Sequence, residues 1–331
     1  MKTDLNSKLE EILLKGSEKP NLFIVYTWCT KDPDKLQPDD FPIHEVKLTG
    51  EQEFTSQLSN ILQTAKMAEE NNMIVVLNVE KDSMPEANFH NLLEVLYNTP
   101  VKIELCNPEK KFNPNLGDLG SHVDITKART CMDLHERFGS PVMSIDVDMA
   151  LDPRLFLPWF EGHKDIPFNL IEHPKRGRPY PPYIENSLIF YNYKDDDKAK
   201  DCVCNTYDAM LEMHDNVLNC TYSIQERNFA RYHKQKYNKP EHSYIKDEDM
   251  TPEKIGSIPK QSFIPWDITN ANRENNAKTW SDDTWSDDST AKTKFAKKEQ
   301  CLELVKQYLT PKGMLTTNSI SSKAQHDEIQ K

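Results

Sequence analysis

Short apolar runs of strand length alternate with helical patterns through the first third of the chain. The runs at residues 22–28 (LFIVYTW) and 73–79 (MIVVLNV) are rich in β-branched and aromatic side chains, which favour buried strands. Residues 57–67 and 88–97 carry apolar side chains at helical spacing, and another strand-like run follows at residues 101–105. Strands that alternate with helices of this size predict an α/β fold with a mainly parallel sheet and helices on both faces.

The rest of the chain continues this alternation. A helix is predicted at residues 126–138, ended by Gly139, and a strand at residues 141–149 (PVMSIDVDM) follows it. The remaining predicted elements are strands at residues 44–48 and 188–191 and helices at residues 202–214, 222–236 and 294–309. The acidic run at residues 195–197 between two of these elements is interpreted as a solvated turn.

The length of 331 residues fits one large domain or two small ones. We expect an N-terminal helix at residues 1–20 and one dominant domain at residues 21–310. Residues 311–331 are expected to form a disordered tail, because the chain there is polar and lacks aromatic side chains.

The composition excludes several classes of protein. A formal net charge of -12 argues against a nucleic-acid partner, because phosphate binding needs a concentrated positive surface. With only 9 glycines and neither Gly-rich phosphate-binding motif, the chain would hold a phosphate by a metal ion and cationic side chains. No apolar run has the length of a membrane span, and the 7 cysteines, including Cys202 and Cys204, are irregularly spaced. These features predict a cytoplasmic protein with reduced thiols.

Two acids interrupt the apolar strand predicted at residues 141–149. In an extended strand, Asp146 and Asp148 would point to the same face, at the carboxyl end where open α/β sheets bind ligands. Their mutual repulsion favours a bound cation, and Mn²⁺ or Mg²⁺ prefers such oxygen ligands and bridges to phosphates. The alternative is a pair of solvated acids at a strand end, because D-x-D triplets are frequent by chance.

The order of motifs around these acids resembles the DxD glycosyltransferases of the GT-A fold. Lys127 and Arg129 are followed by a helix, a glycine, an apolar strand and the two acids. Residues 186–192 (NSLIFYN) are similar to the strand that borders the sugar site in that family. The resemblance covers about residues 22–266, and its specific motifs lie between residues 124 and 192.

This resemblance implies a GT-A-like fold, a Mn²⁺ or Mg²⁺ cofactor and a nucleotide-sugar donor, most simply a UDP- or GDP-sugar. Asp146 and Asp148 would be the metal ligands, with Asp148 at the diphosphate and Asp146 nearer the nucleoside or sugar. Lys127 and Arg129 would face the donor. The acceptor would be a glycan, a protein or a small molecule.

The resemblance also implies a sugar-binding strand and a catalytic carboxylate. Asn186 and Ser187 would border the donor, although a glycine often stands at the position of Ser187 in the family. Several of these families carry a later Asp-Gln pair, and the nearest counterpart here, Gln225-Glu226, departs from it. An inverting enzyme needs a carboxylate base to deprotonate the acceptor hydroxyl. The candidates for this base are Glu226, Glu185 and Glu172.

Two further groups of residues are weaker candidates for binding the acceptor or a phosphate. Lys175, Arg176 and Arg178 form a basic cluster in a net acidic chain, and a solvated loop is the alternative. Trp280 and Trp285 lie in a repeated Trp-Ser-Asp-Asp sequence, which is either a lid over the site or a flexible acidic segment.

The function predicted from these residues is metal-dependent transfer of a sugar from a nucleotide-diphosphate donor to a hydroxyl acceptor. A nucleotidyltransferase or phosphotransferase could use the same paired acids. A non-catalytic structural or interaction protein with a similar sheet is the alternative from a different class.

Overall fold

The computed structural model describes residues 19–29, 57–80, 96, 99–106, 119–147, 149–173, 183–214, 225, 228–229, 232, 264–265 and 268. The chain divides into two compact units. Unit 1 comprises Met1–Asn107, Asp146–Pro153 and Thr269–Lys331, and unit 2 comprises Pro108–Ile145 and Arg154–Ile268. The predicted elements at residues 44–48 and 294–309 and the predicted tail lie outside the described residues, as does the predicted N-terminal helix except residues 19–20. The helices predicted at residues 88–97 and 222–236 are described only at residue 96 and at residues 225, 228–229 and 232. The predicted domain boundaries therefore stay predictions.

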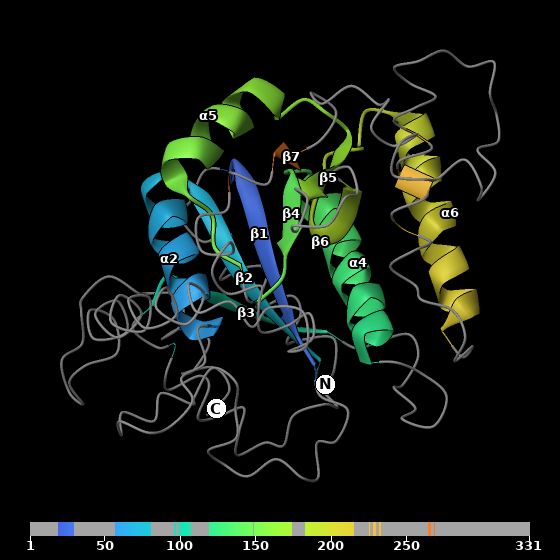
Figure 1. Cartoon of the computed structure of the whole chain (residues 1–331), viewed down its shortest axis with the longest axis horizontal. Coiled ribbons are helices and arrows are strands. Elements are labelled where there is room, and N and C mark those ends of the chain that lie inside the picture. Colours follow the sequence, from blue (N-terminus) through green and yellow to red (C-terminus); the bar gives the residue numbers. More distant parts are fainter. Residues whose placement is uncertain are drawn as a thin grey trace, which may run out of the picture. The chain divides into compact units, whose positions relative to one another are not determined.

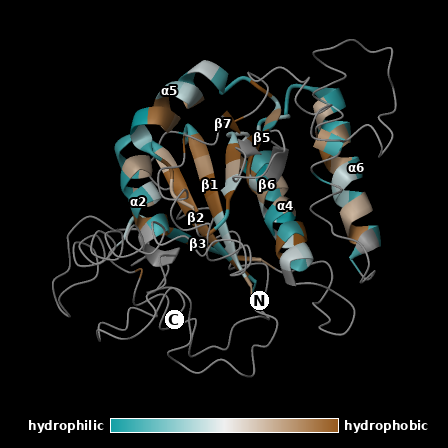
Figure 2. Ribbon diagram, in the orientation of Figure 1, coloured by the Kyte–Doolittle hydropathy of each residue, from teal (hydrophilic) through white to brown (hydrophobic). Residues whose placement is uncertain are grey.

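The elements that the structure describes in unit 1 include three parallel strands and a helix (Figure 1). The strands are β1 (Leu22–Trp28), β2 (Met73–Glu80) and β3 (Lys102–Cys106), in the order β3-β2-β1. The helix α2 (Gln57–Glu70) packs on β2. Every residue of β1 is buried, as parallel strands covered on both faces require. Figure 2 shows the contrast between the mainly apolar strand β1 and the mixed surface of α2.

Unit 2 contains a mixed set of strands in the order β4-β6-β5-β7. Its elements are α4 (Leu119–Phe138), β4 (Val142–Ile145), α5 (Pro153–His163), β5 (Phe168–His173), β6 (Tyr183–Tyr191), α6 (Asp197–Met213) and β7 (Ile264–Pro265). The strand β6 runs antiparallel to β4 and β5, whereas β5 and β7 are parallel. Helix α4 ends where predicted, because Gly139 adopts a φ of 63° and its N–H donates to the His135 carbonyl at 2.8 Å.

Helices cover both faces of the strands in unit 2. The Phe190 ring of β6 packs edge-on against Trp159 and Phe160 of α5. The next residue, Tyr191, points to the opposite face, where side chains of α4 and α6 and the Phe229 ring surround it. Among the pairings of described strands within the two units, three are parallel and two are antiparallel. The predicted mixed, mainly parallel α/β fold is therefore confirmed.

Several element boundaries differ from the predicted ones. Helix α4 begins at residue 119 instead of 126, and α6 begins at residue 197 instead of 202. Strand β6 begins at residue 183 instead of 188, and β4 ends at Ile145 instead of residue 149. The sequence analysis missed β5, and it missed α5 because Pro158 lies inside that helix, where proline removes a backbone donor.

The interpretation of residues 195–197 as a solvated turn is wrong in part. Asp196 is the N-cap of α6, and its side chain accepts a hydrogen bond from the Ala199 N–H at 2.9 Å. The same carboxylate accepts from the Tyr232 hydroxyl at 3.0 Å. An acid at this position stabilises the free N–H groups of the first helical turn, so one member of the run begins the helix.

Among the described cysteines, Cys29, Cys106, Cys131, Cys202 and Cys204 are free thiols, which agrees with the reduced state predicted for Cys202 and Cys204. The helices in the described ranges are all too short or too polar to cross a membrane.

Candidate functional site

The predicted metal ligand Asp146 directly follows the buried strand β4 and is half-buried. The chain turns at this point, because the Met149 N–H donates to the Asp146 carbonyl at 3.0 Å. We call residues 146–149 the acidic turn. The strand alternation used to place Asp146 and Asp148 on one face therefore stops at Ile145. Asp148 itself lies outside the described residues.

The acidic turn belongs to unit 1, where three buried polar side chains contact the backbone of the turn and of the residues just after it. The Asn60 amide Nδ2 donates to the Val147 carbonyl at 3.3 Å, and the Tyr26 hydroxyl donates to the Met149 carbonyl at 3.0 Å. Two residues beyond the turn, the Leu151 N–H donates to Thr64 Oγ1 at 3.3 Å. The turn is thus held by side chains of β1 and α2.

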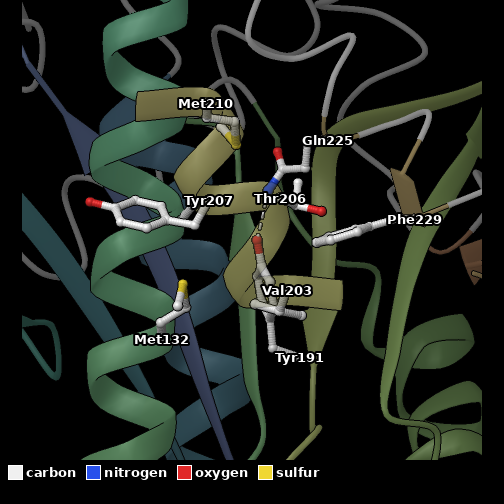
Figure 3. Close-up of a pocket in the computed structure, with 9 residues that line it drawn as sticks. Met132, Tyr191, Val203, Thr206, Tyr207, Met210, Gln225 and Phe229 are labelled. Carbon is white, nitrogen blue, oxygen red and sulfur yellow. Dashed lines mark hydrogen bonds between the residues drawn. The ribbon is translucent and has the colours of Figure 1, made fainter. Parts of the chain in front are cut away.

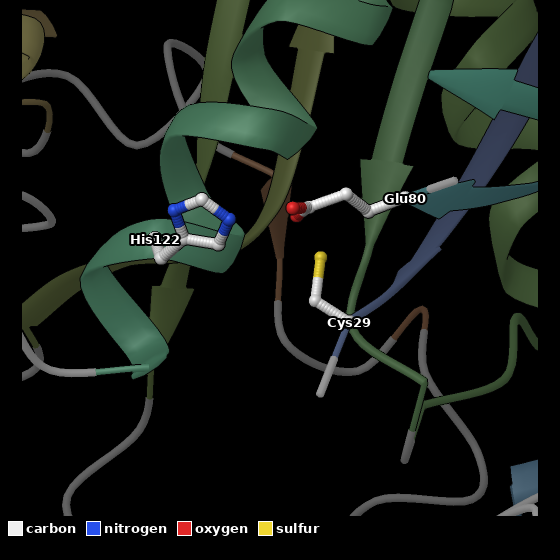
Figure 4. Close-up of side chains that lie close together, drawn as sticks. All are labelled: Cys29, Glu80 and His122. Atoms are coloured by element: carbon white, nitrogen blue, oxygen red, sulfur yellow. The ribbon is translucent and has the colours of Figure 1, made fainter. Parts of the chain in front are cut away.

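Two further polar side chains lie at the carboxyl ends of β1 and β2 in the same unit (Figure 4). Cys29 follows β1, Glu80 ends β2, and the Cys29 Sγ and a Glu80 carboxylate oxygen lie within 4.8 Å of each other. Two residues earlier on these strands, the Asn78 Nδ2 donates to Thr27 Oγ1 at 3.4 Å. A thiol and a carboxylate are both groups that can bind divalent metal ions.

In unit 2, Lys127 lies on α4 with only 2% of its surface exposed. Its ammonium group is 3.3 Å from Asp124 Oδ1 and donates to the Asn186 carbonyl of β6 at 3.1 Å. The ion pair compensates the buried charge, and the second contact ties α4 to the predicted sugar-binding strand. The structure thus brings together two of the predicted donor-binding residues.

The contacts of Lys127 continue into a chain of hydrogen bonds. The Asn186 Nδ2 donates to Gln225 Oε1 at 3.4 Å, and the Gln225 Nε2 donates to the Tyr191 hydroxyl at 2.9 Å (Figure 3). Burial raises the pKa of Tyr191 well above its ordinary value, so this phenol stays neutral near pH 7. The chain links Gln225, beside the predicted base Glu226, to residues of β6.

Arg129 makes different contacts from Lys127. A step of two residues turns the side chain about 200° around a helix axis. Accordingly, the Arg129 Nε donates to the carboxylate of Asp133 at 3.1 Å, and its guanidinium lies 6.0 Å from the centre of the Tyr207 ring. The two side chains of this ion pair are 43% and 47% exposed. These contacts of Arg129 thus involve other residues than the contacts given above for Lys127.

The other predicted site residues are described in part or not at all. Ser187 is buried on β6, and the backbone of Glu185 pairs with Ile171 of β5. Glu172 lies in β5, where its backbone pairs with Ile184. The predicted site residues outside the described ranges are Asp148, Lys175, Arg176, Arg178, Glu226, Trp280 and Trp285. Their assignments stay predictions.

The sequence analysis missed the side chains that hold the acidic turn. A usable signal was present, because Asn60 and Thr64 are polar residues one turn apart on the apolar side of the helix predicted at residues 57–67. Both are almost completely buried. A local break in an apolar pattern is a common mark of a functional site.

No protein-family model matches the sequence, and no curated protein matches it. Among solved structures, the galactosyltransferase LgtC, in complex with donor and acceptor sugar analogs, is 9% identical, with coverage of 87% of this chain and 97% of that chain and a TM-score of 0.44. The glycosyltransferase GlyE of Streptococcus pneumoniae TIGR4 is also 9% identical, covering 88% and 63%, with a TM-score of 0.39. Mouse xyloside xylosyltransferase 1 is 10% identical, covering 65% and 83%, with a TM-score of 0.36.

Proposed function

We propose that this protein is a metal-dependent glycosyltransferase that moves a sugar from a nucleotide-diphosphate donor to a hydroxyl acceptor. The observation that carries the proposal is the position of Asp146, a half-buried acid at the turn where the buried strand β4 ends. Carboxyl ends of strands are the ligand-binding edge of open α/β sheets. Asp148 follows two residues later and supplies a second carboxylate for the same cation.

The available donor atoms fit a hard divalent cation. Asp146 and Asp148 offer carboxylate oxygens, which Mn²⁺ and Mg²⁺ prefer. When bound, the ion supplies positive charge against the charge that develops on the diphosphate leaving group. Lys127 fixes the backbone at Asn186, and Asn186 with Ser187 borders the donor sugar.

The remaining roles are part of the same proposal. Glu226 or Glu185 takes the proton from the acceptor hydroxyl if the enzyme inverts the sugar centre. Arg129 contacts the donor. The acceptor or a phosphate contacts a group of residues that comprises Lys175, Arg176, Arg178, Trp280 and Trp285.

Calorimetry of the full chain with Mn²⁺ and UDP, GDP or CMP tests this proposal. We expect one nucleoside diphosphate to bind only when Mn²⁺ is present. Asp146→Asn and Asp148→Asn should each weaken that binding by about tenfold or more, which corresponds to about 1.4 kcal/mol. Glu70→Gln, at an exposed position of α2 in the same unit, is the matched control for loss of a negative charge. If Asp146→Asn and Asp148→Asn bind Mn²⁺ and nucleotide as tightly as the parent, the metal assignment is wrong.

The nature of the products separates the proposal from nucleotidyl transfer, which could use the same acids. A glycosyltransferase releases the nucleoside diphosphate from a nucleotide-sugar, whereas a nucleotidyltransferase releases pyrophosphate from a nucleoside triphosphate. Nucleotide-sugars incubated with the protein, Mn²⁺ and a hydroxyl acceptor should yield UDP or GDP together with the glycosylated acceptor.

A further inference from the structure

Two polar residues interrupt the buried face of α2. Asn60 and Thr64 are one helical turn apart, with exposed fractions of 1% and 0%, and their neighbours Ile61 and Ala65 are buried and apolar. Removing an amide or a hydroxyl from water costs free energy unless a hydrogen bond replaces the water. The hydrogen-bond partners of Asn60 and Thr64 therefore indicate the role of these side chains.

Thr64 belongs to a directed chain of hydrogen bonds that ends on the acidic turn. Its hydroxyl and the Tyr26 hydroxyl are 2.7 Å apart, and the Tyr26 hydroxyl donates to the Met149 carbonyl at 3.0 Å. Thr64 Oγ1 in turn accepts from the Leu151 N–H at 3.3 Å. Because each hydroxyl has one proton, Thr64 donates to Tyr26 and Tyr26 donates to Met149. The pair thus holds the backbone on both sides of residue 150.

Asn60 contacts the centre of the turn. Its Nδ2 donates to the carbonyl of Val147, the residue between the two acids, at 3.3 Å. Its Oδ1 is buried and makes no hydrogen bond with the described part of the chain. A buried asparagine whose amide oxygen accepts no hydrogen bond contributes little to stability, because that oxygen has lost its hydrogen bonds to water without replacement. The contact with Val147 is therefore the feature that accounts for an asparagine here.

We propose that Asn60, Thr64 and Tyr26 are positioning residues that hold the acidic turn in the conformation needed for cation binding. They act through the backbone at Val147, Met149 and Leu151 and do not touch the cation. The inference rests on the proposed function, because it assigns a cation to Asp146 and Asp148. Replacing residues that orient the metal ligands without contacting the metal typically lowers metal affinity by about 10–100-fold.

The first test measures the dissociation constant for Mn²⁺ with saturating UDP or GDP, together with the denaturant midpoint of the full chain. Asn60→Ala and Thr64→Val should each raise the dissociation constant by about tenfold. Thr64→Ser, which keeps the hydroxyl, should recover most of the affinity. The matched control is Thr99→Val, which removes a fully buried hydroxyl of unit 1 that donates to the Leu96 carbonyl at 2.8 Å. This control should lower stability and leave the dissociation constant within twofold of the parent value.

The second test measures amide hydrogen exchange in the acidic turn in the absence of a cation. Amide hydrogen exchange at Met149 and Leu151 should become faster in Asn60→Ala and Thr64→Val, and it should stay unchanged in Thr99→Val. If the parent binds no Mn²⁺, the proposed function is wrong and exchange alone decides the positioning role. If the parent binds Mn²⁺ and these variants match it in both affinity and exchange, the positioning role is wrong while the proposed function stands. Tyr26→Phe, which removes only the hydroxyl, gives an independent third variant.

Discussion

The Lys127 ammonium group and its counter-ion, the Asp124 carboxylate, are buried together inside unit 2. Their pairing compensates the charge of both groups, and the side chains are 3% and 11% exposed. Lys127→Met should lower the free energy of unfolding by about 3–5 kcal/mol, because Asp124 loses its buried cation. Replacing both residues, as in Lys127→Met with Asp124→Leu, should recover most of this loss. Urea unfolding measured at pH 7 checks both expectations.

Arg129 provides the control for this prediction on the same helix. Its ion pair with Asp133 is partly exposed to solvent, so Arg129→Gln should change the free energy of unfolding by less than about 1 kcal/mol. A similarly small effect of Lys127→Met would contradict the structural role of the buried pair. In that case, the donor affinity of the Lys127 variant would become the measure of its function.

Lys102 on β3 gives unit 1 a distinctive pH dependence. Burial lowers the pKa of Lys102 from 10.5 to about 8, against an opposing contribution from Glu69. Between these values the unfolded chain binds more protons than the folded chain, so this residue makes stability rise as the pH rises from 8 to 10.5. Below pH 8 its charged form destabilises the fold by an amount on the order of 3 kcal/mol at most.

Lys102→Met should therefore be more stable than the parent at pH 7, and the difference should shrink as the pH approaches 10.5. The melting temperatures of parent and variant, measured in parallel from pH 7 to 10.5, check this expectation. Lys66→Met, at an exposed position of α2, controls for the loss of a positive charge. A difference between parent and Lys102→Met that does not vary with pH would contradict the burial of this ammonium group.

At the scale of elements, the start of α6 depends on Asp196, one of the three consecutive acids at residues 195–197. Asp196→Ala removes the N-cap contact with the Ala199 N–H and the bond from the Tyr232 hydroxyl. The loss should be about 1–2 kcal/mol in the free energy of unfolding, as for other N-cap replacements. Asp195→Ala, at an exposed position outside the helix, should change it by less than about 0.5 kcal/mol. Equal effects of the two substitutions in urea unfolding would contradict the N-cap assignment.

At the scale of the whole molecule, ligand binding should appear as thermal stabilisation. A ligand at 100 times its dissociation constant stabilises the folded state by about 2.7 kcal/mol. Mn²⁺ with UDP or GDP should therefore raise a melting temperature by several degrees, and a chelator should reverse the shift. Neither Mn²⁺ alone nor nucleotide alone should reproduce the full effect. The absence of a shift with every nucleotide and metal would favour a non-catalytic interaction protein.

Two compact units also affect how such a measurement is interpreted. A chain that divides in this way need not unfold in one step, so a single melting temperature can hide two transitions. Asp146 belongs to unit 1, whereas Lys127 and Asn186 belong to unit 2. Mn²⁺ bound at the acidic turn should therefore raise the transition of unit 1.

The sequence by itself determined the elements whose signals are local. The burial of β1 and β2 follows from runs rich in apolar and β-branched side chains, and α2 follows from apolar residues at helical spacing. The end of α4 follows from Gly139, because glycine adopts a positive φ without steric cost. Asp146 could be singled out because an acid directly after an apolar strand breaks the local pattern. These signals act over a few residues and need no partner elsewhere in the chain.

Only the tertiary structure decided which groups meet. The Lys127 ammonium group and the Asn186 carbonyl are 59 residues apart in sequence, and the Asn60 amide and the Val147 carbonyl are 87 residues apart. Strand β4 ends at Ile145 and does not continue to residue 149 as predicted, because the chain turns there and its backbone binds to side chains of α2 and β1. Such contacts depend on how elements pack and on which buried polar groups still lack a hydrogen-bond partner. No local pattern of residues encodes these two conditions.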